Sequence, residues 1–205
     1  MARKPNFKYD DEVYGKFGED DFKNFCVETL NYTFLDVSKD ERFQIADIDF
    51  LISPSLDLPC YGLDIINVKE LIFDRYPKDR MPSIYKFEVK TDTRSFETRN
   101  IVVEMISHDF SGCMANSKAD FVYYVFVDDS GDEIVKKEAW YINLYKLREY
   151  LRINFFGHTI YEDFSDMSRE FGIITNNYDA YGDKVANFLI NIEKLQENGI
   201  AKRVF

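Results

Sequence analysis

The chain has 205 residues, of which 37 are acidic and 26 basic, so its formal net charge is −11. Such a charge repels nucleic acid at long range, and it excludes a protein that coats a phosphate backbone with a broad basic face. No apolar run is typical of a membrane span, no signal-peptide pattern opens the sequence, and three widely spaced cysteines indicate buried thiols, so we expect a cytoplasmic protein.

The first part of the chain alternates between helical and extended patterns. Residues 1–13 are polar and charged and predict a loose arm, whereas apolar side chains recur at steps of three and four between Tyr14 and Leu30 and predict a helix. The segment from Phe43 to Ser53 predicts a strand entered through two aspartates, and the segment from Leu63 to Ile72 predicts a second strand. Prolines mark the stretch after each of them as a loop.

Period-two alternation is clearest between Ile84 and Thr91, where apolar and charged side chains take opposite faces. The segment from Phe121 to Val127 is apolar on both faces, as a central strand is. Further predicted elements are strands at 100–106 and 139–144, short helices at 112–118 and 144–151, and an apolar segment at 185–195 whose type stays open.

These elements predict an α/β fold whose mixed central sheet has about four or five strands. We expect the helix from Tyr14 to Leu30 and the segment near Ser117 to pack on its faces. The predicted organisation is a polar arm at 1–13, a core domain at 14–155, and a loop-rich extension at 156–205 that packs on the core or follows it.

Three acids and a lysine stand out among the charged residues. Glu19 lies on the apolar stripe of the first predicted helix, where a carboxylate is costly unless it has a partner. Asp49 opens a strand, and Glu88 and Lys90 lie two residues apart on the next clear strand, so they share one face. Carboxylates that converge in this way bind Mg²⁺ or Mn²⁺ through hard oxygen ligands. A lysine beside such a site would orient an attacking water or stabilise charge on a phosphoryl group.

The order of Glu19, Asp49 and the tripeptide Glu88-Val89-Lys90 resembles the PD-(D/E)xK nuclease superfamily. The stretches KFEVKTDTRSFETRNIVVEM, SGCMANSKADFVYYVF and WYINLYKLREYL are similar to phage-encoded, nuclease- or resolvase-like proteins of that superfamily. The resemblance implies a restriction-endonuclease-like core in residues 14–155. It also implies that Asp49 and Glu88 are metal ligands, that Lys90 is the catalytic lysine, and that Glu19 is an additional helix-borne acid.

This sequence departs from the family pattern at three points. Ile48 stands where the family name has a proline, and Arg99 replaces the glycine of a Thr-Gly-Asn turn. The first metal ligand stays open between Asp49, Asp64 and Asp47, in that order of preference, because an apolar strand directly continues Asp49.

Basic and polar residues near the motif are candidates for contacts to the substrate. They are Arg94, Arg99, Asn100 and Lys118, with Arg148 and Arg152 as further basic residues of the same small patch. Glu104 ends the strand at 100–106 and either faces the site or is an exposed strand end.

The sequence therefore predicts a metal-dependent endonuclease that hydrolyses DNA phosphodiesters, with a branched-DNA or Holliday-junction resolvase-like role as its narrower form. Such a phage-type enzyme would act in the host cytoplasm, without a membrane, and two coordinated cuts would require a homodimer. The alternative is a catalytically inactive nuclease-fold module that acts as an acidic protein-binding or anti-defence protein. The acidic composition favours that alternative, and the intact acid-x-lysine pair opposes it.

Overall fold

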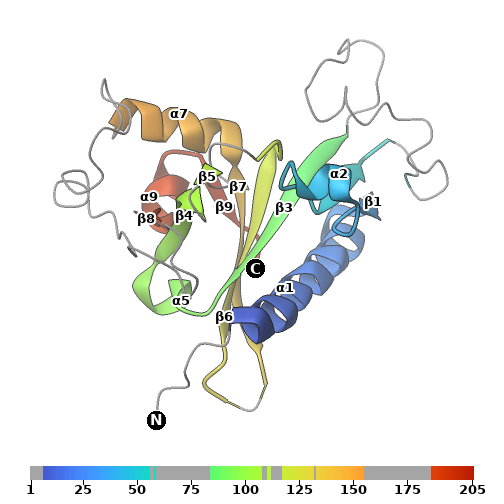
Figure 1. The fold of residues 1–205 in the computed structure, drawn as a ribbon, viewed down its shortest axis with the longest axis horizontal. Coiled ribbons are helices and arrows are strands. Elements are labelled where there is room, and N and C mark those ends of the chain that lie inside the picture. The colour runs from blue at the N-terminus through green and yellow to red at the C-terminus, as the bar shows by residue number, and fades with distance from the viewer. Residues whose placement is uncertain are drawn as a thin grey trace.

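We analysed a computed structural model, which describes residues 7–55, 58, 84–107, 110–111, 117–131, 133–154 and 186–205 (Figure 1). Its helices are α1 (Phe7–Asn24), α2 (Glu41–Gln44), α5 (Ser95–Thr98), α7 (Leu144–Asn154) and α9 (Ile192–Glu197), and the π-helical segment η1 (Phe25–Leu30) continues α1. Its strands are β1 (Thr33–Asp36), β2 (Phe50–Ser53), β3 (Tyr85–Asp92), β4 (Asn100–Ser107), β5 (Phe110–Ser111), β6 (Phe121–Asp128), β7 (Val135–Asn143), β8 (Ala186–Asn191) and β9 (Ala201–Arg203).

The strands form two sheets. The central sheet has the order β1-β2-β3-β6-β7-β9, in which β3 and β6 are parallel and all other neighbours are antiparallel. The second sheet has the order β5-β4-β8 and is antiparallel. The molecule is thus a mixed α/β fold with a mixed central sheet flanked by helices, which confirms the predicted class at this level.

One face of the central sheet packs against α1. The odd-numbered residues of β3 point to this face, and the ring of Phe87 lies 4.9 Å from the ring of Phe22 on α1. Tyr123 of β6 stacks on Phe25 at the start of η1, with ring centroids 5.1 Å apart. Burial of these large aromatic surfaces fixes α1 against β3 and β6.

The opposite face packs against the second sheet. Tyr124, Phe126 and Trp140 of the central sheet share one buried cluster with Ile101 of β4 and Phe188 of β8. Figure 1 shows α1 on one side of the central sheet and β4 and β8 on the other. Because even-numbered residues of β3 take this second face, Glu88 and Lys90 point away from α1.

Several predictions about the elements were wrong. Helix α1 begins at Phe7, so residues 7–13 are helical and not part of a loose arm, and acidic residues in this first part suit the positive end of a helix. Residues 43–49 are not a strand: the side chain of Asp40 accepts a hydrogen bond from the backbone N–H of Arg42 and caps α2, so the strand begins only at Phe50.

The number and membership of the strands also differ from the prediction. The central sheet has six strands and not four or five, and the strand at 100–107 belongs to the second sheet. The apolar segment at 185–195 contains both a strand and a helix, β8 and α9. Residues 117–119 are irregular, while the rest of the predicted helix at 112–118, the predicted strand at 63–72 and most of the extension at 156–205 lie outside the described residues.

No helix among the described residues is long and apolar enough to cross a membrane.

Candidate active site

Asp49 is held directly against β3 by two hydrogen bonds. Its backbone N–H donates to the carbonyl oxygen of Phe87 at 2.8 Å, which continues the β2–β3 ladder. Its carboxylate Oδ2 accepts from the backbone N–H of Val89 at 2.7 Å. The strand β2 begins only at Phe50, so this carboxylate satisfies a backbone donor that a longer strand would have bonded. The turn that precedes β2 therefore places an acid at the middle of β3.

Glu88 and Lys90 share the face of β3 that is turned away from α1. Lys90 Nζ lies 2.9 Å from Glu88 Oε1, and the side chain of Lys90 is 39% exposed while that of Glu88 is 5% exposed. Glu88 Oε2 is buried and has no hydrogen-bond partner in the part of the chain that the structure describes. The pair thus consists of a buried acid with one oxygen left for a further ligand and a lysine at its solvent side.

Burial and neighbouring acids raise the pKa values of both carboxylates. Desolvation raises the pKa of Glu88 to about 7, against the opposing effect of the Lys90 ammonium and with support from Asp47 and Asp49. Desolvation also raises the pKa of Asp49 to about 6, although the N–H of Val89 and the charge of Lys90 act in the opposite direction. The two carboxylates are therefore close enough to repel each other, and a positive charge placed between them would be stabilised.

Asp47 is a further acid at this site. It takes a left-handed backbone conformation, with φ of 50°, in the turn between α2 and β2. Burial raises its pKa, Lys90 lowers it, and Glu104 of β4 raises it again. Glu104, which lies on β4 of the second sheet, is therefore within electrostatic range of Asp47. Asp49 is the aspartate that is bonded to β3, whereas Asp64, the other candidate ligand, lies outside the described residues.

Glu19 lies on α1, which packs on the opposite face of β3 from the side chains of Glu88 and Lys90, and it is within electrostatic range of Asp49. Gly18 lies so close to β3 that a Cβ atom there would be 2.2 Å from Thr91 Oγ1, so α1 is in close contact with β3 directly before Glu19. Burial raises the pKa of Glu19, and its charge contributes to the raised pKa of Asp49. Glu19 also lines a pocket of about 750 Å³ between α1 and residues 36–40.

The candidate substrate-binding residues are distributed over several places. Arg94 is exposed at the start of α5, and Asn100 opens β4 opposite Asn191 in the second sheet. Lys118 is exposed, and its backbone N–H donates to the carbonyl oxygen of Ala46 at 2.8 Å, directly before Asp47 in the turn between α2 and β2. Of these three residues, Lys118 is the one that the backbone hydrogen bonds join to the Asp47 turn.

Arg99 makes a different set of contacts. It has a φ of 59°, so the turn keeps the left-handed conformation that a glycine would favour. Its guanidinium lies 3.0 Å from Glu138 Oε1 on β7 and 3.2 Å from Glu193 Oε1 on α9. Arg99 thus connects the two sheets, and its role in substrate binding stays a prediction.

Lys86 is a residue of this face that the sequence did not single out. It lies two residues before Glu88, it is fully buried, and its Nζ is 3.6 Å from Asp120 Oδ1. The carboxylate of Asp120 also accepts a hydrogen bond from the backbone N–H of Lys86, and the backbone N–H of Asp120 donates to the carbonyl oxygen of Lys86, each at 2.8 Å. These bonds fix the register of β3 against β6. The signal in the sequence that could have indicated a partner for Lys86 is Asp120, which directly precedes the central strand β6.

The chemistry of the carboxylates fits a hard divalent cation. Among the described residues no group of three or more His, Cys, Asp and Glu side chains has the geometry to hold a metal ion. Mg²⁺ commonly binds proteins through one or two carboxylates and keeps several waters, so Asp49 and Glu88 suffice as a donor set. The buried, unpartnered Oε2 of Glu88 is the atom that such a cation would satisfy.

Comparison of the chain with protein-family models, curated proteins and solved structures finds no match.

Proposed function

We propose that this protein is a metal-dependent nuclease that hydrolyses DNA phosphodiesters, with Asp49, Glu88 and Lys90 as its catalytic residues. The observation that carries the proposal is the buried carboxylate of Glu88. One of its oxygens lies on Lys90, the other has no hydrogen-bond partner among the described residues, and Asp49 is within electrostatic range. A mixed sheet with α1 on one face also suits the restriction-endonuclease-like fold, which we include in the proposal.

Each residue has a distinct part in this proposal. Asp49 and Glu88 would hold Mg²⁺ or Mn²⁺, with Asp47, Glu19 and Glu104 adding negative potential around them. When bound, the cation supplies a polarised water and neutralises charge on a phosphodiester oxygen. The half-exposed ammonium of Lys90 would donate a hydrogen bond to the phosphate as negative charge develops there.

The test is cleavage of a supercoiled plasmid by the purified protein with Mg²⁺ or Mn²⁺, and again with a chelator. We expect nicking that the chelator abolishes. Lys90→Ala and Glu88→Gln should each lower the rate by about a hundredfold or more, because each removes a group that acts on the transition state. Circular dichroism should show that both variants remain folded.

Lys137→Ala is the matched control. Lys137 is also a strand lysine, its side chain is 32% exposed, and its Nζ lies 3.1 Å from the carboxylate of Asp128. We expect this variant to cleave like the parent. Metal-dependent cleavage that survives in both site variants would refute the assignment. No nicking with any metal, together with tight binding to a protein partner, would favour the alternative of an inactive binding module.

A further inference from the structure

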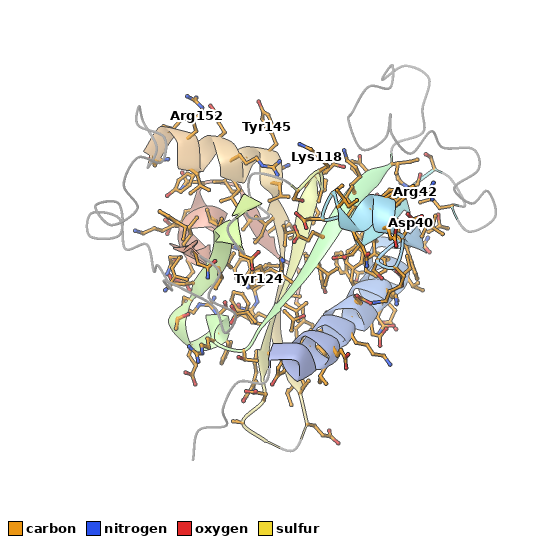
Figure 2. The ribbon with its side chains drawn as sticks, in the orientation of Figure 1. Asp40, Arg42, Lys118, Tyr124, Tyr145 and Arg152 are labelled. Atoms are coloured by element: carbon orange, nitrogen blue, oxygen red, sulfur yellow. The ribbon has the colours of Figure 1, made fainter. Side chains whose placement is uncertain are left out.

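The outer face of α7 combines an exposed aromatic ring with an exposed cation. Tyr145 is 76% exposed, and the side chain of Arg152 is 68% exposed. Seven residues are about two helical turns, so the two side chains lie on one stripe of α7. Figure 2 shows both side chains projecting from α7 on the side away from the sheets. Glu149, which lies between them, holds Arg152 through two hydrogen bonds.

Helix α7 is more basic in composition than the chain as a whole. Helix α7 carries three basic residues, Lys146, Arg148 and Arg152, against one acid, Glu149, whereas the whole chain carries a charge of −11. The ammonium of Lys146 donates to the carbonyl oxygen of Gly199, and one guanidinium nitrogen of Arg148 donates to the carbonyl oxygen of Ser117. A polyanion that is repelled elsewhere would find a local attraction on α7.

Backbone contacts connect α7 to the candidate active site. Arg148 donates from a guanidinium nitrogen to the carbonyl oxygen of Ser117 at 2.6 Å. The hydroxyl of Ser117 in turn donates to the carbonyl oxygen of Asp47 at 3.3 Å, and the exposed Lys118 follows directly. In Figure 2, Lys118 lies at the same end of the molecule as Tyr145 and Arg152. A nucleic-acid strand that crosses this end of the molecule would pass from the candidate active site over Lys118 to α7.

We propose that the outer face of α7 binds an unpaired strand of the DNA substrate, with a base stacked on Tyr145 and phosphates near Arg152 and Lys118. This rests on the proposed function and adds a substrate class to it. The exposed aromatic ring favours single-stranded over double-stranded DNA, since an unpaired base offers its face for stacking whereas a paired base within a duplex does not. Arg152, two turns farther along α7, and Lys118, at the same end of the molecule, would supply the contacts to the phosphate backbone that single-strand binding needs.

The experiment measures fluorescence anisotropy of a labelled, ~20-nucleotide oligothymidine in the Lys90→Ala background with Mg²⁺, so that binding is separated from cleavage. We expect Tyr145→Ala and Tyr145→Leu to weaken binding about tenfold or more, and Tyr145→Phe to bind within about twofold of the background protein, because phenylalanine keeps the stacking ring. Arg152→Ala should lower the slope of log K against log salt by about 0.7, the value for one phosphate contact on a single strand.

Arg42→Ala is the matched control for Arg152→Ala. Arg42 is also an exposed arginine paired with a nearby carboxylate, that of Asp40, and Figure 2 shows this pair on α2, away from α7. We expect this variant to keep the affinity and salt dependence of the background protein. Tyr145 is exposed, so thermal unfolding of its variants should match that of the background protein.

Four results would overturn the inference. The first two are a lack of oligothymidine binding at low salt and equal binding by Tyr145→Ala and the background protein. The other two are an equal loss for Tyr145→Leu and Tyr145→Phe, and equal affinity for a fully paired hairpin. Cleavage by the parent with binding independent of Tyr145 would leave the nuclease proposal intact. Binding that depends on Tyr145 without any cleavage would refute the nuclease proposal and retain this surface.

Discussion

Burial places Glu88 near the midpoint of its titration at neutral pH. The pKa of about 7 follows mainly from desolvation, since the Lys90 ammonium at 2.9 Å acts to lower it. The metal-free protein therefore binds a proton at Glu88 more strongly when folded than when unfolded. A bound divalent cation would reverse this preference, because the ionised carboxylate would then have a partner.

This raised pKa predicts how stability depends on pH in the metal-free protein. The contribution of Glu88 is fully present below the ordinary pKa of 4.5 and is lost as the pH rises through about 7. The loss is of the order of 3 kcal/mol in the free energy of unfolding. Glu88→Gln should flatten this part of the curve, and Mg²⁺ at pH 8 should stabilise the parent more than the variant.

Urea unfolding at a series of pH values, with and without chelator, measures this effect. Glu28→Gln, which changes an exposed glutamate of η1, is the control and should follow the parent. Curves of the same slope for Glu88→Gln and the parent would contradict the account of the site.

At the scale of the elements, α1 makes a close contact with β3 at Gly18, directly before Glu19. Two glycines of α1 differ sharply in their surroundings. A Cβ atom at Gly18 would lie 2.2 Å from Thr91 Oγ1 and 3.0 Å from Val89 Cγ1, whereas a Cβ atom at Gly15 would have no other atom within 4 Å. Thr91 is β-branched and Val89 is packed against the core, so neither can move aside easily.

The two glycines therefore provide an internal comparison. Gly18→Ala should destabilise the protein by about 1–3 kcal/mol, because it forces α1 away from β3. Gly15→Ala should stabilise it by about 0.5–1 kcal/mol, because alanine is the better helix former. Chemical denaturation of both variants gives the two values, and equal effects would show that α1 does not approach β3 in this way. If the nuclease proposal holds, Gly18→Ala should also slow cleavage.

Elements with a repeating pattern could be predicted from the sequence, and those fixed by single contacts could not. The alternation in β3 gave both the strand and the shared face of Glu88 and Lys90. The segment at 43–49 carries apolar residues that suit a strand, but the cap by Asp40 makes it a helix and a turn. The approach of Glu104 to Asp47 depends on how two sheets pack, which no local pattern encodes.

At the scale of the whole molecule, Arg99 joins the two sheets. Its guanidinium contacts Glu138 of the central sheet and Glu193 of α9, which follows the second sheet. Glu138 is buried, and its other oxygen accepts from the indole N–H of Trp140 at 2.8 Å. A buried carboxylate needs such partners, so the ion pair fixes how the sheets lie on each other.

Arg99→Gly tests this connection without straining the turn, since glycine favours the left-handed conformation found there. We expect a loss of about 2 kcal/mol in the free energy of unfolding, because Glu138 would lose its nearest cation. Trp140 is the only tryptophan of the chain and lies beside Glu138, so its fluorescence follows the change.

Arg203→Ala is the comparison, because Arg203 lies farther from Glu138, at 3.4 Å, and is half exposed. It should cost less than Arg99→Gly. Unchanged stability in Arg99→Gly would mean that apolar packing alone holds the sheets together.

The hydrogen bond from the Val89 N–H to the carboxylate of Asp49 makes one atom serve two purposes. The same oxygen completes the backbone bonding of β3 and belongs to the acid that would bind the cation. A related protein that had lost catalytic activity would thus still be constrained at this position. An aliphatic residue in place of Asp49 would leave the backbone N–H of Val89 without its hydrogen bond. Retention of an acid or amide at this position in a related chain would be no proof that the chain is an enzyme. The glutamate at position 88 is the more informative marker of activity, because its ionised carboxylate is buried and therefore destabilises the folded protein in the absence of metal.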